Sequence, residues 1–374
     1  MSQSLSNRAP VPARRVTLAK LRKSPLIAFY EITRACDLVC SHCRACAQAQ
    51  SDPNELRAAD GRRLVDQLAE FSEPPTLVIT GGDPLKRPDV FSLVEYAASR
   101  SLDVGVTPSA TPLVTFAALR RLRDAGMSRL AISLDGADAH THDAQRGVPG
   151  SYDRTWDIMA MAKDLQIPLQ INTTLTPANS EQLDQIADQL ARPKIVLWSV
   201  FFLVPVGRAA MSPRFTTEQY EIAFDTLWRH SLRQPYLIKT TEAPHFRRFV
   251  LRKLRGGELR DVLPLSKRQN LLHRMTVGTN DGKGILFVSH VGLIHPSGFL
   301  PIVCGLFPFH DLVYTYQNSP VFRRLRDAGR LQGKCKFCEY RQICGGSRAR
   351  AYAVTGNLDA QDPDCEYIPV AMMS

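Results

Sequence analysis

Two groups of cysteines have the side-chain type and spacing that metal chemistry requires. The first group, in the string CDLVCSHC, is Cys36, Cys40 and Cys43. Three thiols are one ligand short of the four that close a tetrahedral zinc site or saturate a four-iron cluster. The missing ligand leaves an open coordination position, which a reactive site needs. The alternatives are a zinc loop completed by His42 or Cys46, or three unrelated thiols.

The second group contains four cysteines in a C-x2-C-x5-C-x20-C pattern: Cys335, Cys338, Cys344 and Cys365. Four thiols saturate either a zinc ion or a [4Fe–4S] cluster, and spacing alone does not separate the two. Cys46 and Cys304 stand outside both groups. We expect these two to be small, buried thiols without a ligand role.

An alternation of short apolar runs with helically spaced stretches must position these residues. The runs predict six strands, at 26–33, 76–80, 102–106, 129–134, 169–174 and 196–203. Strands separated by helices indicate a parallel sheet with right-handed crossovers, hence an α/β domain of open or barrel-like form. In such folds ligands gather beyond the carboxyl ends of the strands. The candidate residues near those ends are Gly81, Gly82, Asp83, Ser109, Asp135, Arg146, Asn172 and Gly207.

The string ITRACDLVCSHCRACA, directly after the first predicted strand, resembles the radical S-adenosylmethionine (radical SAM) superfamily. The resemblance covers residues 25 to about 230 and implies a partial (β/α)6 TIM-like barrel. It also implies that Cys36, Cys40 and Cys43 hold a [4Fe–4S] cluster. The amino and carboxylate groups of SAM would then chelate the fourth iron.

The same resemblance assigns roles to the residues at the strand ends. Gly81-Gly82-Asp83-Pro84 is similar to the family's GGEP loop, which receives the methionine amino group, with Asp83 in place of the usual Glu. Ser109, Asp135 and Arg146 fall at positions that border the SAM site. Asn172 corresponds to the strand that meets the ribose, and Gly207 to a segment near the adenine.

The C-terminal string CKFCEYRQICGGSRARAYAVTG resembles the SPASM-type auxiliary-cluster region of radical SAM maturases. It is most similar to the abbreviated form in radical SAM enzymes of alternative haem biosynthesis, where one four-cysteine cluster replaces two. Arg348 stands where the full pattern has a further cysteine. The resemblance implies an auxiliary [4Fe–4S] cluster that accepts an electron from the substrate or helps to hold it.

These assignments predict four segments along the 374 residues. We expect a flexible basic tail (1–24), a radical SAM core (25–230), a helical linker (231–284) and a small SPASM/twitch-like cysteine-rich domain (285–374). The first 30 residues contain no apolar signal-peptide region, and the most apolar run has 12 residues, too short to span a bilayer. The prediction is a cytoplasmic protein without a membrane partner.

The expected activity is reductive cleavage of SAM to a 5′-deoxyadenosyl radical, which takes hydrogen from a ribosomal peptide or a tetrapyrrole side chain. The outcome is net oxidation or decarboxylation, and the electron donor is a protein such as flavodoxin or ferredoxin. The alternatives are a radical SAM RNA-modifying enzyme and a non-catalytic iron–sulfur or zinc regulator. Of the net charge of +11, residues 1–24 supply +6 and residues 323–350 supply +7, which leaves −2 elsewhere. We therefore do not expect a nucleic-acid partner.

Overall fold

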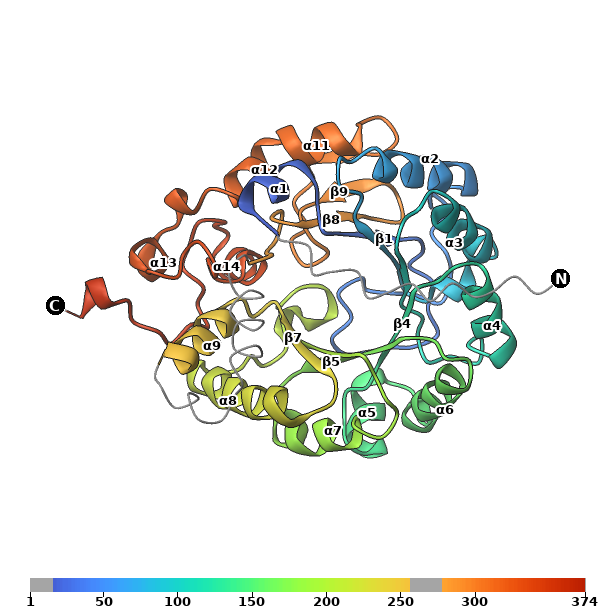
Figure 1. The fold of residues 1–374 in the computed structure, drawn as a ribbon, viewed down its shortest axis with the longest axis horizontal. Coiled ribbons are helices and arrows are strands. Elements are labelled where there is room, and N and C mark those ends of the chain that lie inside the picture. Colours follow the sequence, from blue (N-terminus) through green and yellow to red (C-terminus); the bar gives the residue numbers. More distant parts are fainter. Residues whose placement is uncertain (1–15, 256–277, 374) are drawn as a thin grey trace.

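One ten-stranded sheet organises the computed structural model, which describes residues 16–255 and 278–373. The spatial order of the strands is β10-β9-β8-β1-β2-β3-β4-β5-β6-β7, and the sheet curves around a central space with helices outside it (Figure 1). The strands are β1 (Ile27–Glu31), β2 (Thr76–Thr80), β3 (Val104–Val106), β4 (Arg129–Ser133), β5 (Leu169–Leu175), β6 (Leu197–Phe202), β7 (Leu237–Thr241), β8 (Ile285–Val288), β9 (Leu293–His295) and β10 (Gly305–Leu306).

The six predicted strands correspond to β1–β6, and each pairs in parallel with its neighbour. The mixed α/β fold with a parallel, partly closed barrel is therefore confirmed. Helices cross between the strands, so the carboxyl ends of the parallel strands meet at one edge. The crossover helices are α2 (Ala58–Ala69), α3 (Val90–Ser99), α4 (Phe116–Asp124), α5 (Ala139–Arg146), α6 (Ser151–Asp164), α7 (Leu183–Gln189), α8 (Thr217–Arg233) and α9 (His245–Arg255).

Alternation along the strands separates the core from the barrel interior. On β2, Leu77 and Ile79 are fully buried beneath the helices, whereas Val78 and Thr80 line an internal cavity. Because successive side chains point to opposite faces of a strand, alternate residues divide between these two layers. Each fully buried leucine or isoleucine contributes roughly 1.5–3 kcal/mol to the free energy of unfolding. The helix-facing layer thus stabilises the barrel, while the inner layer is available for ligands.

Strand β7 lies inside the range expected to be a helical linker. It pairs in parallel with β6, so the expectation of helix is wrong for Leu237–Thr241. The sequence LIKTT lacks the apolar run used to recognise the other strands, because Lys239 stands at its centre and lines the internal cavity. Residues 256–277 of the expected linker lie outside the described part of the chain.

The hairpin of β8 and β9 joins the main sheet, since β8 pairs in parallel with the free side of β1. The remaining helices follow it or cover that end of the sheet: α1 (Leu18–Lys23), α11 (Leu312–Asn318), α12 (Pro320–Leu325), α13 (Gly333–Phe337) and α14 (Arg348–Thr355).

Helix α1 belongs to the stretch expected to be a flexible tail. Leu21 is buried there, and its carbonyl accepts a hydrogen bond from the Tyr316 hydroxyl at 2.7 Å. The tail expectation is therefore wrong for this helix, and residues 1–15 lie outside the description.

In the described ranges, no helix combines the length and the apolar character needed to cross a membrane.

Candidate active site

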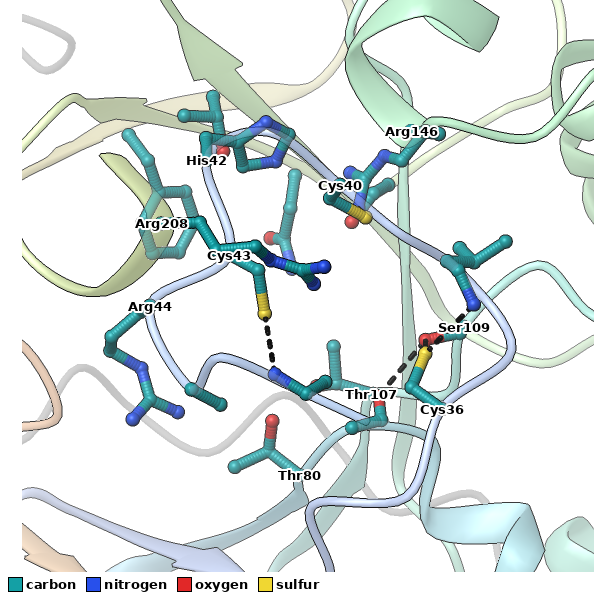
Figure 2. A pocket seen from close by; sticks show the side chains of 18 of the residues that line it. Cys36, Cys40, His42, Cys43, Arg44, Thr80, Thr107, Ser109, Arg146 and Arg208 are labelled. Carbon is teal, nitrogen blue, oxygen red and sulfur yellow. Dashed lines mark hydrogen bonds between the residues drawn. The ribbon is translucent and has the colours of Figure 1, made fainter. Parts of the chain in front are cut away.

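The loop after β1 brings the first three cysteines to the carboxyl end of the barrel. Cys36, Cys40 and Cys43 line one cavity of about 200 Å³, and Figure 2 shows them around a common space. Backbone N–H groups steady two of the sulfurs, because Leu38 donates to Cys36 and Ala47 donates to Cys43, each at 3.4 Å. The predicted grouping of these thiols in one site is thus present in the structure.

Two arginines place positive charge beside the thiols. Nη1 of Arg146 lies 3.7 Å from Sγ of Cys40. Burial alone would raise the pKa of Cys43, but the N–H of Ala47 and the guanidinium of Arg208 hold that pKa below its usual value. Because the thiolate is the form that binds metal, the Ala47 N–H and the Arg208 guanidinium favour the ligating state of Cys43. Burial raises the pKa of Cys36, and Arg208 is not among the groups that lower it.

The two glycines of the GGDP loop line the cavity, but their missing side chains face the cysteine loop. A Cβ at Gly81 would lie 2.5 Å from the Thr33 carbonyl oxygen, and one at Gly82 would lie 2.3 Å from that of Ala35. The Gly82 N–H donates to the Thr33 carbonyl at 2.8 Å. The glycines therefore allow two loops to pack together, in addition to any approach to a ligand.

Asp83 does not line the cavity. Its side chain is fully buried and accepts hydrogen bonds from the Thr111 hydroxyl at 2.7 Å and the Leu85 N–H at 3.1 Å. Burial raises the pKa of this carboxyl above its ordinary value. Asp83 thus stabilises the GGDP loop. In this geometry its carboxylate does not reach the cavity and so cannot contact a methionine amino group there.

Of the other predicted residues, some reach the cavity and some support it. Ser109 lines the cavity, donates to the Gly82 carbonyl at 2.9 Å and lies 3.3 Å from Cys36 Sγ. Gly207 adopts a φ of +61°, and a Cβ there would lie 2.4 Å from the Arg44 carbonyl oxygen, so it fits one loop against another. The predicted residues that line the cavity are Gly81, Gly82, Ser109, Arg146 and Asn172, and those behind it are Asp83, Asp135 and Gly207.

The other lining residues include His42, considered above only as a zinc ligand, and two arginines, Arg44 and Arg208, to which the sequence analysis gave no role. Burial lowers the pKa of His42 to about 4, so its ring is neutral near pH 7. Arg44 donates to the Glu31 carboxylate at 2.9 Å and lies over the Phe287 ring at 4.7 Å. In the sequence, His42 and Arg44 flank Cys43, and Arg208 follows Gly207. This adjacency was the signal that could have predicted their place in the site. An arginine next to a metal ligand has no periodicity that would distinguish it from a surface residue.

A second, larger cavity of about 300 Å³ fills the barrel interior. It meets the thiol cavity along a shared boundary, formed by Arg44, Thr80, Thr107, Asn172, Phe201 and Phe299. A molecule in the barrel would therefore lie next to one held at the thiols.

The second cysteine group lines a separate small cavity at the C-terminal end of the chain. All four thiols, Cys335, Cys338, Cys344 and Cys365, face it. Burial raises the pKa of Cys365 to about 12, so a neutral thiol is the stable form without a metal. As the side chains stand, the described residues include no three His, Cys, Asp or Glu groups converging on a single metal-ion position.

The two remaining cysteines line neither cavity. Burial raises the pKa of Cys304 to about 11, which agrees with the expectation of an inert thiol. Cys46 is exposed, so the expectation that it is buried is wrong. Its φ of +48° is left-handed, and its N–H donates to the Cys43 carbonyl at 3.3 Å, so it lies in a turn at the end of the cysteine loop.

A three-thiol loop after the first strand of a parallel barrel, flanked by cations and opening on an internal cavity, defines a radical SAM enzyme. Residues 30–190 match the Radical SAM superfamily. The chain is 35% identical over 352 residues to the AdoMet-dependent heme synthase of Methanosarcina barkeri, covering 93% of this chain and 98% of that protein. It is 36% identical over 349 residues to the AdoMet-dependent heme synthase of Nitratidesulfovibrio vulgaris, covering 92% of each. The chain belongs to the radical SAM superfamily.

The fold is similar to that of Streptococcus suis SuiB, solved in complex with its precursor peptide SuiA. The TM-score is 0.72 at 18% identity, covering 94% of this chain and 78% of SuiB. Membership of the family implies a [4Fe–4S] cluster and SAM. Three thiols in one cavity with two adjacent cations suit such a cluster, because its thiolate-bound form is anionic.

Proposed function

We propose that this enzyme uses SAM to abstract hydrogen from a propionate side chain of a tetrapyrrole, with oxidative loss of the carboxylate. The barrel cavity beside the thiol site is the observation that carries this proposal. Its lining combines aromatic and aliphatic side chains with hydroxyl, amide and cationic groups. A flat apolar ring with carboxylates at its edge matches that chemistry. Similarity to AdoMet-dependent heme synthases over more than nine-tenths of the chain supports the same substrate class.

The chemistry that a reduced [4Fe–4S] cluster and SAM supply is cleavage of the C5′–S bond, giving methionine and a 5′-deoxyadenosyl radical. In this proposal Cys36, Cys40 and Cys43 hold the cluster. Arg146 and Arg208 offset its negative charge, and this raises its reduction potential.

Residues at the strand ends would then hold SAM itself. Gly81, Gly82, Ser109 and Asn172 line the cavity that would receive it. Phe201 and Phe299 lie on the boundary with the barrel interior, where they limit the access of water to a reactive carbon.

When one propionate loses its carboxylate, the deoxyadenosyl carbon takes one hydrogen atom from the side chain, and carbon dioxide leaves. A vinyl group forms, and one electron remains to be removed. We assign the acceptor of that electron to an auxiliary [4Fe–4S] cluster at Cys335, Cys338, Cys344 and Cys365. The first electron comes from a reductant such as flavodoxin or ferredoxin, in the cytoplasm.

The test uses anaerobically reconstituted enzyme with SAM, dithionite and propionate-bearing porphyrins, with and without iron. We expect 5′-deoxyadenosine together with a porphyrin that has lost carbon dioxide and two hydrogen atoms per reacted side chain. The Cys36→Ala variant should form neither product, whereas Cys304→Ser should form both. Deoxyadenosine without any change in porphyrin mass would overturn the assignment of substrate.

A peptide substrate is the second candidate, since SuiB shares the fold and was solved with a precursor peptide. It requires an extended chain to enter the barrel cavity. Substrate-dependent deoxyadenosine formation with a peptide, and none with any porphyrin, would favour it.

A further inference from the structure

Three cationic side chains line the barrel cavity: Arg44, Arg129 and Lys239. Arg44 is already paired with the Glu31 carboxylate at 2.9 Å. Lys239 lies on β7, in register with Ser199 on β6, which is itself in register with Asn172 on β5. Side chains in register on neighbouring strands point to the same face of the sheet. All three face the cavity, so Lys239 occupies the same layer as Asn172.

Lys239 has no counter-charge in residues 16–255 or 278–373. No carboxylate oxygen of these residues lies within 4.0 Å of its Nζ, and no hydrogen bond from it is formed to them. More than a third of the residue's surface remains accessible, and the residue lines the cavity. Burial, with the charges of Arg247 and Arg129, lowers its pKa to about 8.

Protein around Lys239 removes part of the water from its ammonium group without supplying hydrogen bonds in its place, and this costs free energy. The group regains those interactions when an anionic ligand arrives, and a carboxylate forms a short, charge-assisted hydrogen bond with it. The one carboxylate side chain among the described residues that line this cavity is Asp103, which forms no ion pair with another described residue. The interior therefore carries excess positive charge that its own residues do not neutralise.

We propose that Lys239 binds a carboxylate of the substrate inside the barrel, and that this is a carboxylate the reaction leaves in place. The inference rests on the proposed function, since it assumes an anionic substrate in this cavity. Lys239 lines the barrel cavity but not the thiol cavity, so a group held at Lys239 lies beside the SAM site rather than within it. Lys239 is thus a positioning residue that fixes how the ring is turned.

Equilibrium binding to the reconstituted enzyme tests the inference. The probes are a propionate-bearing porphyrin and its methyl ester, each followed by its absorbance. Lys239→Gln should weaken binding of the free acid about 10- to 100-fold, the effect of losing one charge-assisted hydrogen bond. It should change binding of the ester by less than about twofold, within the usual scatter of such measurements. Lys239→Arg should restore much of the affinity for the acid.

The matched control is Lys163→Gln, which removes an exposed lysine on α6 and should leave both affinities unchanged. Equal affinity of wild type and Lys239→Gln for the free acid would overturn the role of Lys239 and leave the proposed function standing. No porphyrin binding by the wild type would overturn the proposed function and this inference together. If Lys239→Gln does not fold, wild-type enzyme that binds acid and ester equally well also refutes the inference.

Discussion

The guanidinium of Arg146 contacts the buried carboxylate of Asp135, with Nη2 2.7 Å from Oδ2. Burial would raise the pKa of Asp135, but Arg146, the two histidines His42 and His142 and the Thr174 N–H together hold that pKa below the usual value. The pair fixes Arg146 so that its other terminal nitrogen lies beside Cys40. Asp135 therefore acts on the thiol site through Arg146 without lining the cavity.

Replacing Asp135 with Asn should destabilise the protein and loosen the cation beside Cys40. Breaking a buried ion pair leaves one charge uncompensated, so we expect a loss of about 3–5 kcal/mol in the free energy of unfolding. Thermal unfolding of the reconstituted protein measures this loss of stability. The control is Asp124→Asn, because the Asp124 carboxylate is 59% exposed and pairs at the surface with Arg123. Equal effects of the two variants would contradict this interpretation.

Replacing Gly82 with Ala should reduce iron at the first site. The new Cβ would lie 2.3 Å from the Ala35 carbonyl oxygen, so the GGDP and cysteine loops would separate. Gly105→Ala is the control, since the nearest atoms to its Cβ lie at 3.8 Å. We expect Gly82→Ala to lose about four irons per chain and Gly105→Ala to lose none. Full iron content in Gly82→Ala would show that the two loops tolerate separation.

Iron and zinc analysis of cysteine variants tests both clusters. Reconstituted wild type should contain about eight irons per chain from two four-iron clusters. Cys40→Ala should lose about half of them together with SAM cleavage. Cys344→Ala should lose the other half. Cys46→Ser, at the exposed thiol, should match the wild type. About four irons with one zinc in the wild type would assign zinc to the C-terminal site.

Binding of a porphyrin acid should weaken as the pH rises above about 8. The pKa of Lys239 is lowered to about 8, so the ammonium is present below that pH and lost above it. A bound carboxylate favours the charged form, which moves the midpoint upward in the complex. Lys239→Arg should remove the dependence, because arginine stays charged. The other charged groups around the site are Arg44, Arg129, Arg247 and Asp103. Wild-type binding of the porphyrin acid that does not change with pH would contradict this prediction.

The sequence predicted β1–β6 and the grouping of the first thiols because apolar runs and cysteine spacing are local signals. Strand β7 escaped prediction, since a strand whose central residue faces a polar cavity lacks an apolar run. The role of Asp83 was also missed. A carboxylate in a loop has the same sequence signature whether it meets a ligand or, as here, accepts from Thr111 in the interior. Side-chain direction of this kind depends on tertiary packing.

The pairing of β8 with β1 has a consequence for biosynthesis. Strand β1 precedes the cysteine loop, yet its second neighbour, Ile285–Val288, emerges from the ribosome only after most of the chain. Until then β1 exposes unpaired backbone groups on that side, a template for aggregation. The strand that leads into Cys36, Cys40 and Cys43 therefore gains its second neighbour late in synthesis. A nascent chain truncated before residue 285 would leave this loop on an open edge.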